Sequence, residues 1–266
     1  MNDWHEVRFG IIEGHNLVKT HEKLRFCLRT KERHEIFLRA FAGATAHFEQ
    51  HDAMDIFVFC LSDHTPSDFS GRLSMWRGYG GNGKGVCIVF DTSKIPHNDA
   101  ASLVISRVSY GSEETRRATL SSYIDKYCDI IACNDIADEV LFYTAQALFE
   151  RFRLAAVFLK DSAFEEEREW RVVYWKTRDT ASKMSNYFHY FVGQRGVEPK
   201  LKLNTEALAA TNDSNLKLED LMDRIILGPS GTSVLQVRSV QRMLELLKLP
   251  NLAKKVVSSK IPYRAN

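Results

Sequence analysis

The sequence lacks a large net charge, paired cysteine motifs and long apolar runs. Its 36 Lys and Arg residues nearly balance 34 Asp and Glu residues, so the formal net charge at pH 7 is +2. This balance gives no bulk electrostatic reason to expect nucleic acid or a membrane as the main partner. The five cysteines include no Cys-x-x-Cys pair, which argues against a zinc ribbon or a disulfide framework. Because no apolar run approaches the roughly 18–20 residues of a spanning helix, we expect a cytoplasmic protein with no membrane partner.

The composition that remains is that of a globular protein. Hydrophobic residues make up 44% of the chain and charged residues 26%, which excludes a disordered or collagen-like chain. We predict one α+β domain over residues 1–266, a small mixed or antiparallel split β-sandwich flanked by helices. Its parts are an N-terminal helical part (1–54), a strand-loop-strand core (55–111), a helical insertion (112–162) and C-terminal strands and helix (163–266).

Local patterns predict the elements within this domain. Helical spacing of apolar residues predicts helices over 14–50, 114–160 and 233–248. Apolar, β-branched and aromatic runs predict strands at 55–62, 86–91, 103–110, 169–175, 187–192, 225–228 and 256–264, and 204–215 is expected to be a polar loop. The strands at 55–62 and 86–91 are expected to be antiparallel neighbours, because a direct parallel crossover needs about a dozen residues or more. Pro262 predicts an edge position for the last strand.

Two charged or glycine-rich segments have an ordinary explanation. Arg25, Arg29 and Arg33 are four residues apart, which predicts a basic, solvated face of the first helical segment rather than an anion-binding stripe. The glycine cluster 78–85 is not a phosphate loop, because Lys84 is followed by glycine and a strand; a flexible hairpin connection is favoured. Residues 228–232, which precede a predicted helix, fit an anion seat or a capped helix start equally well.

An acidic strand start is the main candidate for chemistry. On a strand, Glu167, Glu169 and Arg171 share one face, where two carboxylates can serve acid/base catalysis or stabilise a cationic intermediate. The alternative, which spacing alone favours, is a solvated strand start with Arg171 paired to one glutamate. A third hypothesis, that Glu167 and Glu169 hold the Mg²⁺ of a nuclease, has weaker support, because no further carboxylate lies at useful spacing.

Other catalytic patterns are absent or ambiguous. Trp76 and Tyr79 lie beside the glycines and either pack in a core or stack on a planar ring, core packing being the default for each. No His-x-His or His-Glu-x-x-His pattern occurs, so we predict no metal site. No Gly-x-Ser-x-Gly elbow supports a serine hydrolase.

A set of short blocks resembles a known family. The blocks are Phe59-Cys-Leu-Ser62, Met75-Trp-Arg-Gly-Tyr79, Lys84-Gly-Val-Cys-Ile-Val-Phe-Asp91, Lys160 followed by Glu167-Arg-Glu-Trp-Arg171, Ile225-Ile-Leu-Gly-Pro229 and Ser259-Lys-Ile-Pro-Tyr263. In this order they resemble DUF2971, a bacterial family of unknown function, over nearly the whole chain. The second and fourth blocks are fairly specific.

The resemblance implies a divergent ADP-ribosyltransferase fold, in which a small split β-sandwich grips NAD as a substrate. By this analogy Glu169 or Glu167 stabilises the oxocarbenium ion that forms as nicotinamide leaves. Trp76 or Tyr79 stacks on the nicotinamide, Ser62 orients the site, and Arg171 completes the NAD-contacting set. This is an inference from fold analogy.

The function implied is an NAD-using effector of bacterial toxin or phage-defence type, acting as an ADP-ribosyltransferase or NAD glycohydrolase. Its partners are then a small-molecule nucleotide, a protein or nucleic-acid acceptor, and a protein encoded in the same operon. Family members usually open with a strand before an Asn-Asp-Pro-like turn, and Asn2-Asp3-Trp4 takes the place of that turn with no strand before it. The alternative function is therefore a non-catalytic regulatory module that binds a nucleotide or a partner.

Overall fold

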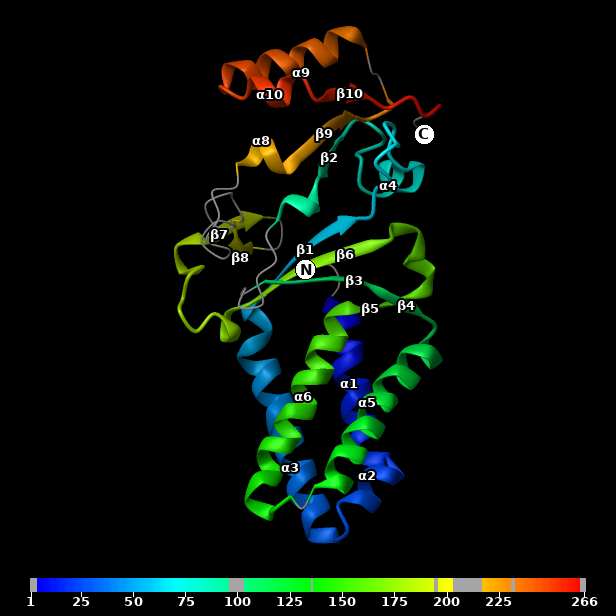
Figure 1. Ribbon diagram of the computed structural model, residues 1–266, viewed down its shortest axis with the longest axis vertical. Helices are drawn as coiled ribbons and strands as arrows, with labels where there is room; N and C mark the ends of the chain where they lie inside the picture. Colours follow the sequence, from blue (N-terminus) through cyan, green and yellow to red (C-terminus); the bar gives the residue numbers. More distant parts are fainter. Residues whose placement is uncertain are drawn as a thin grey trace. The chain divides into compact units, whose positions relative to one another are not determined.

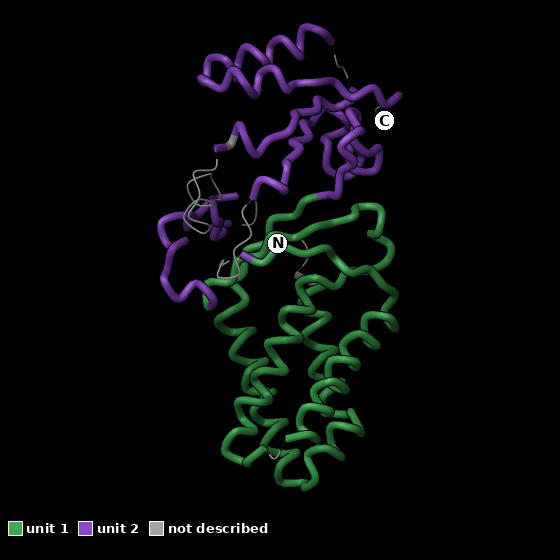
Figure 2. Tube along the Cα trace, in the orientation of Figure 1, with its two compact units in different colours: residues 1–61, 104–177 green, residues 62–103, 178–266 purple. Residues whose placement is uncertain are grey.

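The computed structural model describes residues 4–95, 103–134, 136–193, 196–202, 217–230 and 233–263. The chain forms two compact units, each built from two separate stretches of sequence: residues 1–61 with 104–177, and residues 62–103 with 178–266 (Figure 2). Helices and small sheets occur in both units, so the α+β class is confirmed. The single domain with its four parts stays a prediction. Asn2, Asp3 and the polar segment 204–215 lie outside the described residues.

The first unit combines long helices with short strands. Its helices are α1 (Trp4–Thr20), α2 (Glu22–Cys27), α3 (Lys31–Gln50), α5 (Glu113–Cys133) and α6 (Leu141–Phe158). Its strands are β1 (Ile56–Ser62), β3 (Leu103–Arg107), β4 (Ser109–Gly111), β5 (Leu159–Asp161) and β6 (Glu169–Trp175), although the terminal residues Ser62 and Leu103 are counted in the second unit. Helices α1, α3, α5 and α6 run side by side, and the sheet of order β1-β6-β3 lies at one end of them (Figure 1).

Aromatic and aliphatic side chains fill the centre of this bundle. The Phe41 ring of α3 meets Phe149 and Phe152 of α6 edge-on, with ring centroids 5.6 and 5.7 Å away. Helix α1 approaches α6 closely because Gly10 has no side chain: a Cβ there would lie 2.6 Å from the Cβ of Ala156. The bundle core continues into the sheet through buried Ile56 and Val173. The helices therefore anchor β6 from one side.

The helical segments are more broken than the sequence suggested. The segment predicted over 14–50 begins at Trp4 and divides into α1, α2 and α3. Arg29 has a φ of 69°, which ends the helical path after α2, and the Thr30 side chain then caps α3 by accepting from the Arg33 N–H. The three arginines of the predicted basic face therefore do not share one helix, because Arg25 lies on α2 and Arg33 on α3, where it pairs with Asp138. Arg25 and Arg29 are exposed, as expected for solvated side chains. The segment 114–160 likewise divides into α5 and α6.

The second unit is smaller and richer in turns. Its elements are α4 (Leu73–Gly78), β2 (Val86–Phe90), β7 (Phe188–Gly193), β8 (Gly196–Leu201), α8 (Leu218–Leu221), β9 (Met222–Leu227), α9 (Val234–Leu246), α10 (Pro250–Ala253) and β10 (Val256–Ser258). Strand β9 is central in a sheet of order β10-β9-β2, parallel to β10 and antiparallel to β2. The predicted edge position of the last strand is confirmed for β10, although 261–263 are not in a strand.

Two predictions about the glycine segment are wrong. β1 pairs with β6 and β2 pairs with β9, so these strands are not neighbours and no hairpin joins them. The glycines instead link α4 to β2, and their backbone packs against the end of β9. Gly83 and Gly85 carbonyls accept hydrogen bonds from the Ser230 and Gly228 N–H groups, both at 2.9 Å. A Cβ on Gly228 would lie 2.2 Å from the Gly83 oxygen, which explains the need for glycine there.

Candidate carboxylate and cation site

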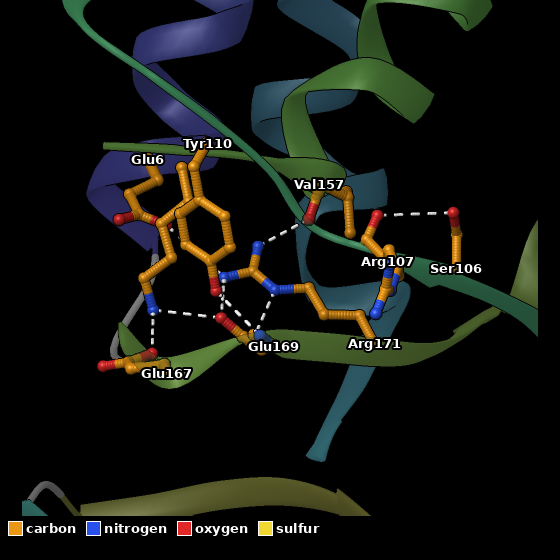
Figure 3. Close-up of polar contacts among 9 residues, drawn as sticks. Glu6, Ser106, Arg107, Tyr110, Val157, Glu167, Glu169 and Arg171 are labelled. Atoms are coloured by element: carbon orange, nitrogen blue, oxygen red, sulfur yellow. Dashed lines mark hydrogen bonds and ion pairs between the residues drawn. The ribbon is translucent and has the colours of Figure 1, made fainter. Parts of the chain in front are cut away.

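Glu169 and Arg171 form the centre of the candidate site. They lie two residues apart on β6, so their side chains share one face of the strand. Arg171 Nε donates to Glu169 Oε1 at 2.8 Å, and Arg171 Nη2 donates to Glu169 Oε2 at 3.2 Å. Both side chains are buried: that of Arg171 is 0% exposed and that of Glu169 is 4% exposed. The alternative of a solvated strand start is therefore wrong for these two residues, although the expected pairing of Arg171 with a glutamate is confirmed (Figure 3).

Glu167 reaches the same site by a different route. A 3₁₀ helix covers Ser162–Glu167, and Arg168 turns the chain with a φ of 42° before β6 begins. Glu167 is thus not on the strand, and its predicted place in the strand alternation is wrong. Lys160 of β5 brings it in, because Lys160 Nζ donates to Glu167 Oε2 at 2.7 Å and to Glu169 Oε2 at 3.0 Å. The two carboxylates are joined through one buried ammonium group.

The remaining donors of Arg171 are also used. Its Nη1 donates to the Val157 carbonyl oxygen at the end of α6, at 2.5 Å. Its Nη2 lies 3.4 Å from Oε2 of Glu6, in the first turn of α1. The guanidinium group therefore ties β6 to two helices of the bundle. A buried arginine is tolerated when its planar donors are matched in this way.

The backbone of Glu169 is held on both sides. Its N–H donates to the Tyr110 hydroxyl oxygen at 2.8 Å, and its carbonyl accepts from the Val108 N–H at 2.9 Å. Tyr110 belongs to β4, which runs parallel to β5 and places Tyr110 opposite Lys160. Burial is the main reason why the pKa of the Tyr110 phenol is raised. The phenol is therefore neutral near pH 7 and keeps its proton.

The environment of Glu169 favours the ionised carboxylate. Burial alone raises the pKa of a carboxyl group, but hydrogen bonds from Arg171, Cys60 and Lys160, together with the charge of Arg171, outweigh burial and lower the pKa of Glu169. A carboxylate in this state is a poor proton donor at neutral pH. It can stabilise positive charge, position cationic groups, or both.

The ammonium group of Lys160 takes the position between the two glutamates that a divalent cation would need. Its side chain is 4% exposed and also lies 4.9 Å from the centre of the Phe164 ring. Within the described ranges, no group of three or more His, Cys, Asp or Glu side chains is arranged to hold a metal ion. The geometry gives no support to a Mg²⁺ site on Glu167 and Glu169.

Three further predicted residues belong to the second unit. Ser62, the last residue of β1, accepts a hydrogen bond from Arg72 Nη1 at 3.2 Å. Trp76 is 4% exposed, donates from its indole N–H to the Ser70 carbonyl at 2.8 Å and packs with Val89 in a core cluster. Tyr79 is 68% exposed.

Of the six predicted residues, the structure thus brings Glu167, Glu169 and Arg171 together. Core packing, the default expectation for both rings, is confirmed for Trp76 and is wrong for Tyr79, whose side chain is mostly exposed. The proposed NAD contacts of Ser62, Trp76 and Tyr79 stay predictions.

Sequence reasoning assigned no role to four members of the site: Glu6, Cys60, Tyr110 and Lys160. Lys160 stands in the block that precedes Glu167, and this neighbourhood was the one available signal for it. Tyr110 sits at the end of a run predicted as one strand, which the structure divides into β3 and β4. Cys60 stands in the block Phe59-Cys-Leu-Ser62, but nothing in that block indicates a contact with Glu169. Glu6 reaches the site only through long-range folding, and no local pattern marks it.

No helix within the described ranges has the length and apolar character needed to cross a membrane.

Comparison with known proteins supports one relationship. Neither the curated proteins nor the solved structures include a match to this chain. Residues 75–172 match the model of a family described as "Protein of unknown function (DUF2971)". This stretch is less than half of the chain, but it contains Trp76, Tyr79, Lys160, Glu167, Glu169 and Arg171. The central part of the chain, including the whole Glu167–Glu169–Arg171 cluster, is therefore similar to DUF2971.

Proposed function

We propose that the chain is an NAD-using ADP-ribosyltransferase-like effector in which Glu167 is the carboxylate that contacts the substrate. The observation that carries this proposal is the difference in exposure between two linked carboxylates. The Glu167 side chain is 18% exposed, whereas that of Glu169 is 4% exposed. Glu169 then acts as a positioning residue, which holds Lys160 and through it Glu167.

The chemistry asked of this site is electrostatic. The bond between nicotinamide and the ribose C1′ breaks, nicotinamide leaves with the bonding electron pair, and the ribose becomes an oxocarbenium ion. A fixed carboxylate beside that cation lowers the barrier without forming a bond. Water or an acceptor nucleophile then attacks C1′ and loses a proton to the solvent. The lowered pKa of Glu169 supports a charge-stabilising role for the cluster rather than proton donation.

The biological setting follows only from the family resemblance. We expect activity in the bacterial cytoplasm, in a toxin or phage-defence system, with a protein or nucleic acid as acceptor and a partner protein from the same operon. The ADP-ribosyltransferase-like fold is part of this proposal.

Nicotinamide release from NAD by the purified chain, with and without cell extract, tests the proposal. Glu167→Gln should lower kcat about 100-fold or more while the Kd for NAD changes little. The substitution removes the negative charge that stabilises the cationic ribose in the transition state, and this charge contributes little to binding of NAD itself. Glu165→Gln, an exposed glutamate in the same 3₁₀ helix, is the matched control and should keep wild-type activity. Absence of both nicotinamide and ADP-ribosylated product from the wild-type protein would refute the enzyme.

A non-catalytic module is the second candidate, and a specific observation favours it. Glu169 and Arg171 satisfy each other at full burial, as expected for a pair that stabilises the fold rather than one that awaits a substrate. Calorimetry with NAD and with NAD-derived nucleotides separates the two candidates. Binding without turnover supports the module, and turnover that Glu167→Gln abolishes removes it.

A further inference from the structure

Polar contacts hold the short helix α2 against α5 within the first unit. Lys23 Nζ of α2 lies 2.7 Å from Asp129 Oδ1 of α5, and the two helices lie side by side (Figure 1). His21 Nε2, at the N-cap of α2, lies 3.1 Å from Ser121 Oγ of α5. These contacts fix which faces of the two helices meet.

The facing sides of the two helices bring two cysteines together. On α2, Cys27 follows buried Leu24 at helical spacing and is 9% exposed; on α5, Cys128 follows buried Ile124 and is 1% exposed. All four residues belong to the same hydrophobic core. The Cys27 thiol donates to the Leu24 carbonyl oxygen at 3.2 Å, and the Cys27 and Cys128 side chains are hydrogen-bonded to each other. Their sulfur atoms are therefore neighbours.

The two thiols differ in how readily they ionise. The hydrogen bond from Cys128, together with the charges of Lys23 and Arg33, outweighs burial and lowers the pKa of Cys27. The same hydrogen bond and burial raise the pKa of Cys128, so this thiol keeps its proton. Because the thiolate is the reactive form of cysteine, Cys27 is the attacking sulfur and Cys128 is the resolving thiol beside it.

The place of Cys27 in the fold gives a small oxidant access to its sulfur. Cys27 is the last residue of a six-residue helix, and the chain turns two residues later at Arg29, which has a φ of 69°. The end of a short helix opens locally at little cost in free energy. The backbones are also close enough for a covalent bond, since Cα atoms of α2 and α5 approach within 8 Å of each other and a disulfide joins Cα atoms about 4.4–6.8 Å apart.

We propose that Cys27 and Cys128 are a redox modification site, at which a hydroperoxide converts the two thiols into a reversible disulfide. The Cys27 thiolate attacks one peroxide oxygen, the O–O bond breaks, and the departing oxygen takes up the proton that Cys27 lost. The sulfur of Cys128 then attacks the sulfur of the Cys27 sulfenic acid. The S–O bond breaks, and hydroxide leaves as water with the proton of Cys128. The two thiols lose two electrons in total, and one hydroperoxide gains them.

Mass spectrometry of the folded, full chain before and after treatment with hydrogen peroxide tests the proposal. The wild-type chain should lose two hydrogens, about 2 Da, and proteolysis should yield a cross-linked peptide pair that contains residues 27 and 128. Dithiothreitol should restore the original mass. Cys27→Ser and Cys128→Ser should each abolish the cross-link. This modification is independent of any activity on NAD.

Cys133→Ser is the matched control, because Cys133 lies on the same helix as Cys128 but is exposed. This variant should form the cross-link as the wild type does. It also assigns the bond, since residues 128 and 133 lie in one tryptic peptide with no Lys or Arg between 127 and 150. Circular dichroism spectra that match the wild type establish that the variants are folded.

Trapping of the sulfenic acid with dimedone tests the division of roles independently. In Cys128→Ser the resolving thiol is absent but a hydroxyl donor remains, so peroxide should leave Cys27 as a sulfenic acid that dimedone labels. In Cys27→Ser, Cys128 should stay unlabelled. A wild-type chain that keeps both thiols after peroxide treatment overturns the proposal. A cross-link that joins Cys27 to Cys133, or dimedone labelling of Cys128 in place of Cys27, overturns it as well.

Discussion

Arg171 and Glu169 form a two-pronged ion pair within one strand, with Nε 2.8 Å from Oε1 and Nη2 3.2 Å from Oε2. The pair is buried between β6 and the helices, since Arg171 also donates to the Val157 carbonyl at the end of α6. Removing two charges from water is costly, and this geometry compensates only while both partners are present. The pair therefore makes the fold sensitive to loss of either residue, whatever its role in catalysis.

Arg171→Met should lower the free energy of unfolding by about 3–5 kcal/mol, because it leaves Glu169 buried without its main partner. Urea denaturation followed by circular dichroism measures the change. Lys31→Ala, which removes the exposed pair with Glu35 on α3, is the control and should cost about 0.5 kcal/mol or less. Equal effects of the two substitutions would contradict the buried-pair interpretation.

The pH dependence of stability should carry the signature of Glu169. Its folded pKa lies below the ordinary value of 4.5, so the unfolded chain binds the proton more readily. The contribution of Glu169 is thus present above about pH 4.5 and is lost as the pH falls through the folded pKa. Urea denaturation of wild type and Glu169→Gln at a series of acidic pH values should show a shallower loss in the variant. Parallel curves would mean that Glu169 has the same pKa in both states.

Gly228→Ala should destabilise the second unit by about 1–3 kcal/mol, because the new Cβ would overlap the Gly83 carbonyl oxygen. Gly43→Ala is the matched control. Among the residues that the structure describes, no atom outside its own helix backbone lies within 4 Å of a Cβ at position 43 in α3, so this substitution should raise stability by up to about 1 kcal/mol. Thermal unfolding of both variants measures the two effects, and opposite signs are expected.

Substitutions of Trp76 and Tyr79 should distinguish a side chain that stabilises the core from one that contacts a ligand. Trp76→Ala removes a core indole and its hydrogen bond to Ser70, which should cost about 3–5 kcal/mol of stability. Tyr79→Ala should change stability by no more than about 0.5 kcal/mol, because the side chain is mostly exposed. If Tyr79 stacks on nicotinamide, the same variant weakens NAD binding in calorimetry. Unchanged NAD affinity would exclude that contact.

Several elements were predictable because their signals are local. The alternation of Glu169–Trp175 predicted β6 at its observed bounds, and the apolar spacing with Ser233 before it predicted α9. The breaks in the N-terminal helices were missed, because the left-handed turn at Arg29 leaves no periodic signal. Strand partners were also missed: β1 and β2 are close in sequence, but each pairs with a strand more than 100 residues away.

The sequence by itself determined that Glu169 and Arg171 face the same way, since side chains alternate along any strand. It also marked the acidic run as the place to look for chemistry. Only the tertiary structure decided that the pair is buried, that Lys160 joins Glu167 to Glu169, and that Tyr110 holds the strand start. Burial and charge pairing depend on which distant segments pack together, and these contacts fix whether a carboxylate is solvated, protonated or locked in an ion pair.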